Sequence, residues 1–136
     1  MPSASSPVRV LTDHVVNPAN DRLKIEVVDE PGHGGACHSY VICGFNTETN
    51  AAADGVPRNA AWILFQNGPI AEVGVNGVTH EALLSILCDR MRGFQSGPYA
   101  SDDNAEALAC MEQAQTALQR RTKARMARGV EGTHTA

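Results

Sequence analysis

Five basic side chains gather near the C-terminal end of a chain that is otherwise acidic. The 136 residues include 11 Lys and Arg against 15 Asp and Glu, which gives a net charge of −4. The clustered basic residues are Arg120, Arg121, Lys123, Arg125 and Arg128. Arginine presents a planar fork of donors that matches phosphate oxygens. A local basic segment on an acidic protein therefore indicates small anions rather than long polyanions as ligands.

Residue types that hold metals or act as nucleophiles are present, but not at the spacing that such sites need. No two of the four cysteines are separated by two residues, as they would be in a zinc or redox motif. His33, Cys37 and His38 lie close in sequence, but a fourth metal ligand is not apparent. No Ser/His/Asp set stands out either. The sequence predicts no metal, no cofactor and no catalytic residue.

The first half of the chain, from Val8 to about Gly77, has the pattern of β-strands. The predicted strands are Leu23–Val28, Cys37–Phe45, Ala60–Gln66 and a short fourth one at Ile70–Val75. A glycine-rich stretch, Gly32–Gly35, lies between two of them, so we expect a turn rather than a phosphate loop that opens a helix. The connections are too short for crossover helices, which favours a small antiparallel sheet.

The second half has the periodicity of helices. Thr79 is the expected N-cap of a helix that ends near Gly93. Ser101 is the expected cap of a longer helix, which runs to about Arg128 and ends at Gly129. The loop between these two predicted helices is short, so we expect them to form an antiparallel hairpin. The predicted class is α+β, with a small N-terminal antiparallel sheet followed by this hairpin.

The long helix has few large apolar side chains for its length. Its expected core positions are Ala105, Leu108, Met111, Gln115, Leu118 and Thr122. About 28 residues extend ~42 Å, which is more than so small a sheet covers. We therefore expect the chain to oligomerise through this helix, because small residues let helices approach closely. The alternative is a long exposed helix that frays at its end.

The chain divides into segments by composition. Residues 1–12 are predicted to be disordered or loosely packed, residues 13–78 to be rich in strands, and residues 79–136 to form the hairpin and a tail within one compact unit. No apolar run approaches the roughly 20 residues that cross a bilayer. Met1–Pro7 lacks the apolar region of a secretory signal. We expect a protein of the cytoplasm with reduced thiols and no contact with a membrane.

The order and spacing of short motifs over residues 13–133 resemble a phage family, Thoeris anti-defence protein one. Its helical hairpin is shared with the anti-CBASS sponge proteins. The motifs are Phe65–Ile70 with Glu72, Gly74–Val78, Asp89-Arg90, Gly93–Tyr99, Asn104-Ala105, Arg121-Thr122, Arg125 and Arg128–Thr133.

The resemblance implies a non-enzymatic sponge that acts in the cytoplasm of the infected bacterial host. It implies that the protein binds and sequesters cyclic nucleotide immune signals, namely glycocyclic ADP-ribose and, at separate sites, cyclic di- or trinucleotides. It also implies a homohexamer, built as a trimer of dimers.

The resemblance further implies a pocket for the ADP-ribose-type ligand made by Phe94, Asn104 and Arg121, which have the family's separations. Without the resemblance, Phe94 reads as a core residue, Asn104 as a helix-start hydrogen bonder and Arg121 as a solvated cation. This chain departs from the family at residues 101–103, where Ser-Asp-Asp replaces the expected Cys-Arg-Glu.

Asn104 and Arg121 lie on one predicted helix, about 25 Å apart along its axis at 1.5 Å per residue. A single cyclic nucleotide is too small to bridge that distance. If both residues contact one ligand, they must come from different chains.

A second pocket for a cyclic trinucleotide is a separate hypothesis, with a plain helix end and tail as the alternative. Glycines let backbone N–H groups approach phosphates closely. Its candidate residues are Arg128, Gly129, Glu131, Gly132 and Thr133.

Three other functions compete with sequestration. Cleavage of a cyclic nucleotide by paired His-x-Thr motifs is disfavoured, because neither His38-Ser39-Tyr40 nor His134-Thr135-Ala136 fits that pattern. An oligomeric nucleic-acid-binding protein would use the basic end of the long helix and show steep salt dependence. A purely architectural oligomer would bind no ligand.

Overall fold

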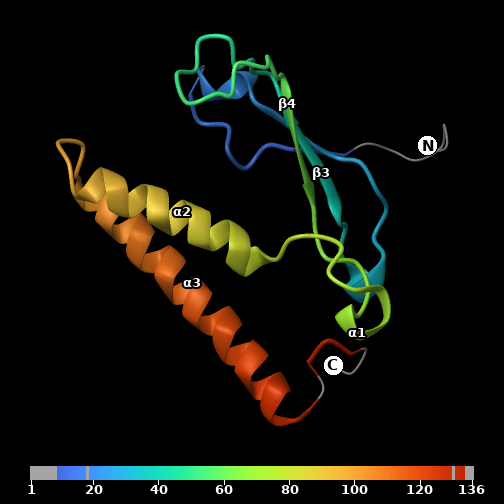
Figure 1. The fold of residues 1–136 in the computed structure, drawn as a ribbon. Helices are drawn as coiled ribbons and strands as arrows, with labels where there is room; N and C mark the ends of the chain where they lie inside the picture. Colours follow the sequence, from blue (N-terminus) through green and yellow to red (C-terminus); the bar gives the residue numbers. More distant parts are fainter. Residues whose placement is uncertain (1–8, 18, 130, 134–136) are drawn as a thin grey trace. The chain divides into compact units, whose positions relative to one another are not determined.

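The computed structural model describes residues 9–17, 19–129 and 131–133. The chain divides into two units, with the boundary between Asn67 and Gly68. The first unit is built from strands and the second from helices (Figure 1). The expected α+β class, with the sheet before the helices, is confirmed.

The first unit holds a four-stranded sheet in which every neighbouring pair is antiparallel and the order follows the sequence. Its strands are β1 (Arg9–Leu11), β2 (Lys24–Val27), β3 (Ser39–Cys43) and β4 (Ala60–Leu64). Two single-turn 3-10 helices, η1 (Asn20–Arg22) and η2 (His33–Gly35), lie in the connections. Connections without long helices favour a return of the chain beside its previous strand, which agrees with the antiparallel order.

The packing of this sheet centres on one row of side chains. Val27 of β2 is fully buried and lies opposite Tyr40 of β3, which lies opposite Ile63 of β4. Residues that are paired across neighbouring strands share a face of the sheet. The Tyr40 ring meets the edge of Phe65, with 5.6 Å between ring centroids. This row fixes the register of β2, β3 and β4.

The glycine-rich stretch between β2 and β3 is a turn, as predicted. Asp29 anchors its return, because the two carboxylate oxygens accept the backbone N–H groups of His38 at 2.8 Å and Ser39 at 3.1 Å. Gly34 and Gly35 have φ angles of 77° and 80°, a region that favours glycine. The segment has no helix after it that could hold a phosphate.

The sequence did not predict β1, which falls within the residues assigned to a loose N-terminus. Three residues are too few for a periodic pattern, and β1 is defined by its pairing with β2, where Val10 lies opposite Glu26. The expectation of disorder over Met1–Pro7 concerns residues outside the described ranges.

The second unit contains α1 (Ile70–Val73), α2 (His80–Gln95) and α3 (Asp102–Ala127). The predicted strand at Ile70–Val75 is wrong, because α1 occupies this position. The N–H of Gly74 donates to the Ile70 carbonyl at 2.9 Å and closes a helical turn, and Gly74 then leaves the helix with a φ of 74°. A segment of four residues carries too little periodicity to separate a strand from one helical turn.

Both predicted N-caps are confirmed. The Thr79 hydroxyl accepts the N–H of Ala82 at 3.1 Å, and the Ser101 hydroxyl accepts the N–H of Asn104 at 3.1 Å. These bonds satisfy donors that the first turn of a helix leaves unpaired. α2 and α3 form the expected antiparallel hairpin (Figure 1).

The hairpin has almost no core of its own. No residue of α3 is buried, and Cys88 is the one buried residue of α2. Ile86 of α2 is 64% exposed and Met126 of α3 is 63% exposed. The expected core positions of α3 are at best half-buried. Stable helices normally gain most of their free energy from a packed face, so α3 retains surface for a further contact.

Gly44 offers a test of the sheet unit. It has a φ of 89°, and a Cβ added there would collide with the backbone carbonyl of Arg22. We expect Gly44→Ala to lower the free energy of unfolding by about 3 kcal/mol or more, measured by chemical denaturation. Gly55→Ala is the matched control, because its φ is 87° but no atom lies within 4 Å. It should cost only about 1 kcal/mol. Equal losses would contradict the close approach at Gly44.

Candidate functional site

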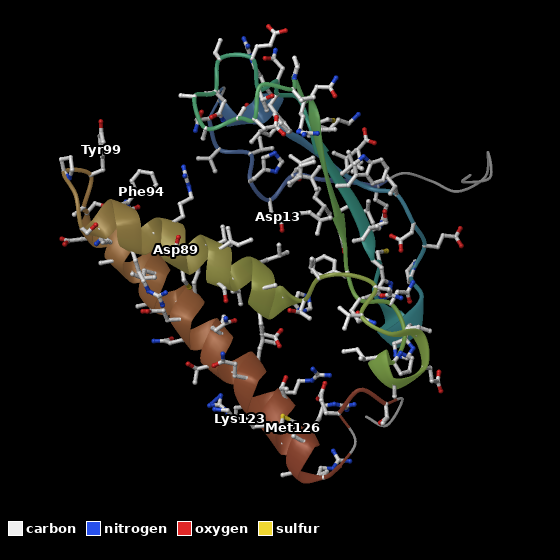
Figure 2. All side chains as sticks on the ribbon, in the orientation of Figure 1. Asp13, Asp89, Phe94, Tyr99, Lys123 and Met126 are labelled. Carbon is white, nitrogen blue, oxygen red and sulfur yellow. The ribbon has the colours of Figure 1, made fainter. Side chains whose placement is uncertain are left out.

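Phe94 lies at the end of the hairpin where α2 passes into α3, near two residues that the sequence analysis did not assign to the pocket. The Tyr99 ring stands edge-on to the Phe94 ring, with 6.5 Å between centroids. The Arg90 guanidinium lies over the Phe94 ring at 4.9 Å from its centroid, a favourable cation–π distance. Figure 2 shows Phe94 and Tyr99 together at this tip. The spacing of four residues between Arg90 and Phe94 on one helix was the signal available in the sequence.

The loop from Ser96 to Ser101 is closed by a reciprocal pair of hydrogen bonds. The Gln95 side chain donates to the Ser101 carbonyl at 3.1 Å and accepts the Ser101 N–H at 3.0 Å. The Ser96 hydroxyl donates to the Gly93 carbonyl at 2.8 Å. One amide side chain thus fixes both backbone polar groups of the residue that caps α3. The tip is held in one arrangement by local bonds.

Asn104 belongs to the same tip. Its side-chain Nδ2 donates to the Tyr99 carbonyl at 3.4 Å, and its backbone N–H donates to the Ser101 cap. Tyr99 therefore contacts both Phe94 and Asn104, and the structure brings these two predicted pocket residues to one place. The helix-start role that the sequence allowed for Asn104 is also realised.

Arg121 is not brought to that place within one chain. It lies on the same continuous helix as Asn104, 17 positions later, hence about 25 Å along the axis. Its side chain is exposed and makes no hydrogen bond or ion pair with any residue in the described ranges. The predicted set is therefore divided, with Phe94 and Asn104 at the tip of the hairpin and Arg121 further along α3.

The basic end of α3 is not uniform. Arg120, Arg121 and Lys123 are exposed, whereas the Arg125 side chain is only 11% exposed and pairs with Glu131, with 3.0 Å between Nε and Oε2. This pair was not anticipated from the sequence.

The residues of the second predicted pocket form an ordered end to α3. Arg128 is the C-cap of α3, and the Gly129 N–H donates to the Met126 carbonyl at 3.0 Å. Glu131 binds Arg125, and the Gly132 carbonyl accepts the N–H of Ala71 in α1 at 3.2 Å. The C-cap that the sequence gave as the alternative is present. These contacts bring all five candidate residues near one helix end.

A groove between α2 and α3 is a feature that the sequence analysis missed. It has a volume of about 360 Å³. Its lining residues are Ser85, Cys88, Arg92, Glu112, Gln115, Thr116 and Gln119. Gln115 donates to the Ser85 hydroxyl at 2.9 Å and to the Glu81 carbonyl at 3.1 Å, while its Oε1 is buried with no partner in the described part of the chain. Glu112, at 2.9 Å, raises the pKa of Arg92 by hydrogen bonding.

Two kinds of feature are absent from the described ranges. No group of three or more His, Cys, Asp or Glu side chains lies where it could hold a metal ion. Among the helices described there, none has the length and apolar character needed to cross a membrane.

Comparisons with known proteins support the resemblance seen in the sequence. Residues 61–123 match the family model described as the Acb2/Tad1 hairpin domain. The protein "Thoeris anti-defense 1" of Bacillus phage SBSphiJ7 is 42% identical over 74 residues, which are 54% of this chain and 52% of that protein. The chain thus spans about half the length of that relative. The resemblance to this phage family is confirmed, and the matched segment contains Phe94, Asn104 and Arg121.

Gln95→Ala should loosen the tip. The substitution removes two hydrogen bonds to Ser101, so we expect a loss of about 1–2 kcal/mol in unfolding free energy and faster hydrogen exchange at the Ser101 amide. Gln113→Ala is the control, because Gln113 is exposed on α3 and should change stability by less than about 0.5 kcal/mol. Unchanged exchange at Ser101 in Gln95→Ala would show that the loop is held by other contacts.

Proposed function

We propose that this protein is a phage anti-defence sponge, which binds and sequesters cyclic nucleotide immune signals without cleaving them. The ligand class proposed for the pocket of Phe94, Asn104 and Arg121 is the glycocyclic ADP-ribose type. Cyclic di- or trinucleotides are a further ligand class for a separate site. The observation that carries the proposal is the match of residues 61–123 to the Acb2/Tad1 hairpin domain, because this segment holds the three candidate residues at the expected separations.

The division of the candidate residues along α3 supports a pocket shared between two chains. Phe94 and Asn104 both contact Tyr99 at the tip, and Arg121 lies about 25 Å away along the helix axis. Two antiparallel copies of α3 would place Asn104 of one chain beside Arg121 of the other. Each pair of chains would then make two equivalent pockets, as two-fold symmetry requires.

The chemistry of the three side chains suits one nucleotide-like ligand. Phe94 offers a face on which a purine can stack, an interaction worth about 1–3 kcal/mol per base in single-strand binding proteins. Asn104 both donates and accepts, which suits a base edge or ribose hydroxyls. Arg121 is exposed with no partner among the described residues, so its donors are available for a phosphate.

Oligomerisation is the structural condition of this proposal. α3 spans 26 residues and buries none of them, and Ile86 and Leu87 of α2 are exposed as well. Contacts between copies would cover these surfaces and enclose the ligand. We propose a homohexamer arranged as a trimer of dimers, in which the dimer contact joins the tip of one hairpin to the basic end of another.

Sequestration also sets a demand on affinity. A sponge must hold the signal at concentrations below the threshold of the defence effector. Nanomolar binding corresponds to about −12 kcal/mol. An arginine–phosphate contact that is shielded from water by two chains, together with base stacking, is the kind of pocket that reaches such values.

The absence of cleavage can be tested directly. The protein is incubated with glycocyclic ADP-ribose, denatured by heat, and the released small molecule is identified by mass spectrometry. We expect the intact cyclic ligand in stoichiometric amount. A linear product would identify an enzyme, and binding of RNA with steep salt dependence but no retention of the cyclic ligand would favour a nucleic-acid-binding protein.

Arg121→Ala should weaken glycocyclic ADP-ribose binding by a factor of about 100 or more, because it removes the proposed phosphate contact. The assembly should keep its mass in native mass spectrometry. Arg120→Ala is the matched control, since Arg120 is also exposed and its removal changes the net charge equally. It should change the affinity by less than about threefold. Retained tight binding in Arg121→Ala would remove this residue from the pocket.

Mixing two inactive variants tests whether the pocket is shared. Asn104→Ala and Arg121→Ala chains are each expected to bind weakly alone. After unfolding and refolding together, one pocket of each mixed dimer combines an intact Asn104 with an intact Arg121. Statistical mixing restores about a quarter of the pockets, which calorimetry reads as a high-affinity fraction. No such fraction from refolded mixed assemblies would contradict the shared pocket.

A further inference from the structure

We propose that Arg125 and Glu131 are positioning residues, which form an ion-paired clasp that shapes the second pocket, the proposed site for a phosphate-bearing cyclic trinucleotide. This inference rests on the proposed function. The name tail loop is used here for Gly129 and residues 131–133. In this proposal Arg125 does not contact the ligand but holds the tail loop in the shape that receives it.

The clasp is more enclosed than the ion pairs of Arg58 and Arg92. The Arg125 side chain is 11% exposed, whereas those of Arg58 and Arg92 are each 57% exposed. Its Nε donates to Glu131 Oε2 at 3.0 Å, and its Nη2 donates to the Thr133 carbonyl at 3.4 Å. One guanidinium therefore binds both a side chain and the backbone of the tail loop, which a surface ion pair does not do.

The tail loop is held from a second side by α1. The Gly132 carbonyl accepts the N–H of Ala71 at 3.2 Å. Gly132 has a φ of 79°, and a Cβ there would lie 3.9 Å from the Ile70 Cβ. Contacts from the end of α3 and from α1 thus converge on three consecutive residues. The tail loop is therefore held in place by contacts within the second unit.

The clasp also explains why an acidic residue, Glu131, can lie in a pocket that is proposed to bind an anion. A free carboxylate at position 131 would repel phosphate, since like charges near each other raise the free energy of the bound state. Arg125 neutralises this carboxylate within hydrogen-bond distance. A carboxylate that is already paired in this way opposes the binding of a phosphate less than a free one would.

The substitution Glu131→Gln distinguishes the positioning role of the clasp from a simple effect of charge on anion binding. The substitution makes the region more positive by one charge, so charge alone predicts tighter binding of an anion. The clasp predicts weaker binding, because a neutral amide holds Arg125 less strongly and the tail loop loses its shape. The two explanations therefore predict changes of opposite sign.

The experiment uses the full chain and cyclic tri-AMP as the probe, with affinity measured by calorimetry. We expect Glu131→Gln and Arg125→Gln each to bind about tenfold more weakly or worse. The exchanged pair Arg125→Glu with Glu131→Arg should return to within about threefold of the original affinity. Lys123→Gln, at an exposed position, is the matched control for Arg125→Gln and should change the affinity by less than about threefold.

Hydrogen exchange gives a readout that does not depend on the ligand. The Ala71 amide and the amides of residues 131–133 should lose protection in both single variants and regain it in the exchanged pair. Tighter binding by Glu131→Gln, or unchanged exchange at these amides, would overturn the clasp.

The failure of the clasp is distinguishable from the failure of the proposed function. Glycocyclic ADP-ribose binding reports on the pocket of Phe94, Asn104 and Arg121, and all clasp variants should keep it within about threefold. If the original chain binds glycocyclic ADP-ribose but not cyclic tri-AMP, the positioning role at a second pocket is overturned while sequestration at the first stands. If it binds neither, the proposed function is overturned, and the positioning role falls with it.

Discussion

α3 is one long, continuous helix in which no residue is buried. Its 26 residues extend about 39 Å, and within its own unit it is contacted mainly by α2. A helix of this length separates the groups at its two ends by more than the size of a nucleotide. A ligand that needs both ends would have to be enclosed by two chains, so binding of such a ligand would depend on association.

The two ends of α3 differ in the interactions that fix their structure. At the start of α3, neutral bonds from Gln95 and the Ser101 hydroxyl fix the tip, and aromatic rings cover it. At its end, cations are gathered, and the enclosed one, Arg125, binds the chain's own carboxylate. The macrodipole favours this distribution, because cations are stabilised near the C-terminus of a helix and Asp102 and Asp103 near its N-terminus. An antiparallel pair would bring the acidic start of one helix near the basic end of the other.

The helices α2 and α3 and the strands β2, β3 and β4 were predicted from local patterns, whereas the short elements α1 and β1 were not. Capping by Thr79 and Ser101 needs only a hydroxyl and an N–H three residues later, so the cap residues themselves indicate where α2 and α3 begin. α1 was mistaken for a strand because its four residues are too few to show a period. β1 was missed because it exists through its pairing with β2. Phe94 and Asn104 could be located at the tip in advance, but Tyr99 between them could not, since that contact depends on the fold of the loop.

The Arg125–Glu131 pair and the groove along α2 could not be predicted, because both join residues whose proximity is a property of the folded hairpin. Glu131 is six positions from Arg125, beyond the reach of regular helical spacing, and meets it only because Gly129 turns the chain with a φ of 72°. In the groove, Gln115 reaches across to Ser85 from a different helix. A glutamine at position 115, where a helix core normally takes an apolar residue, indicated a polar contact but not that Ser85 would be its partner.

The alanine-rich composition of α3 also bears on how two copies of the chain would associate. α3 is rich in alanine together with glutamine, glutamate and arginine, which are the residues with the highest intrinsic helix propensity. Such a helix keeps much of its structure without a buried face, so it need not wait for a partner in order to fold. Association then orders few additional residues, and less of the binding free energy is lost to conformational entropy. Preformed tips and preformed basic ends are thus consistent with the tight binding that sequestration demands, and the short alanine side chains leave the space in which a second helix can approach closely.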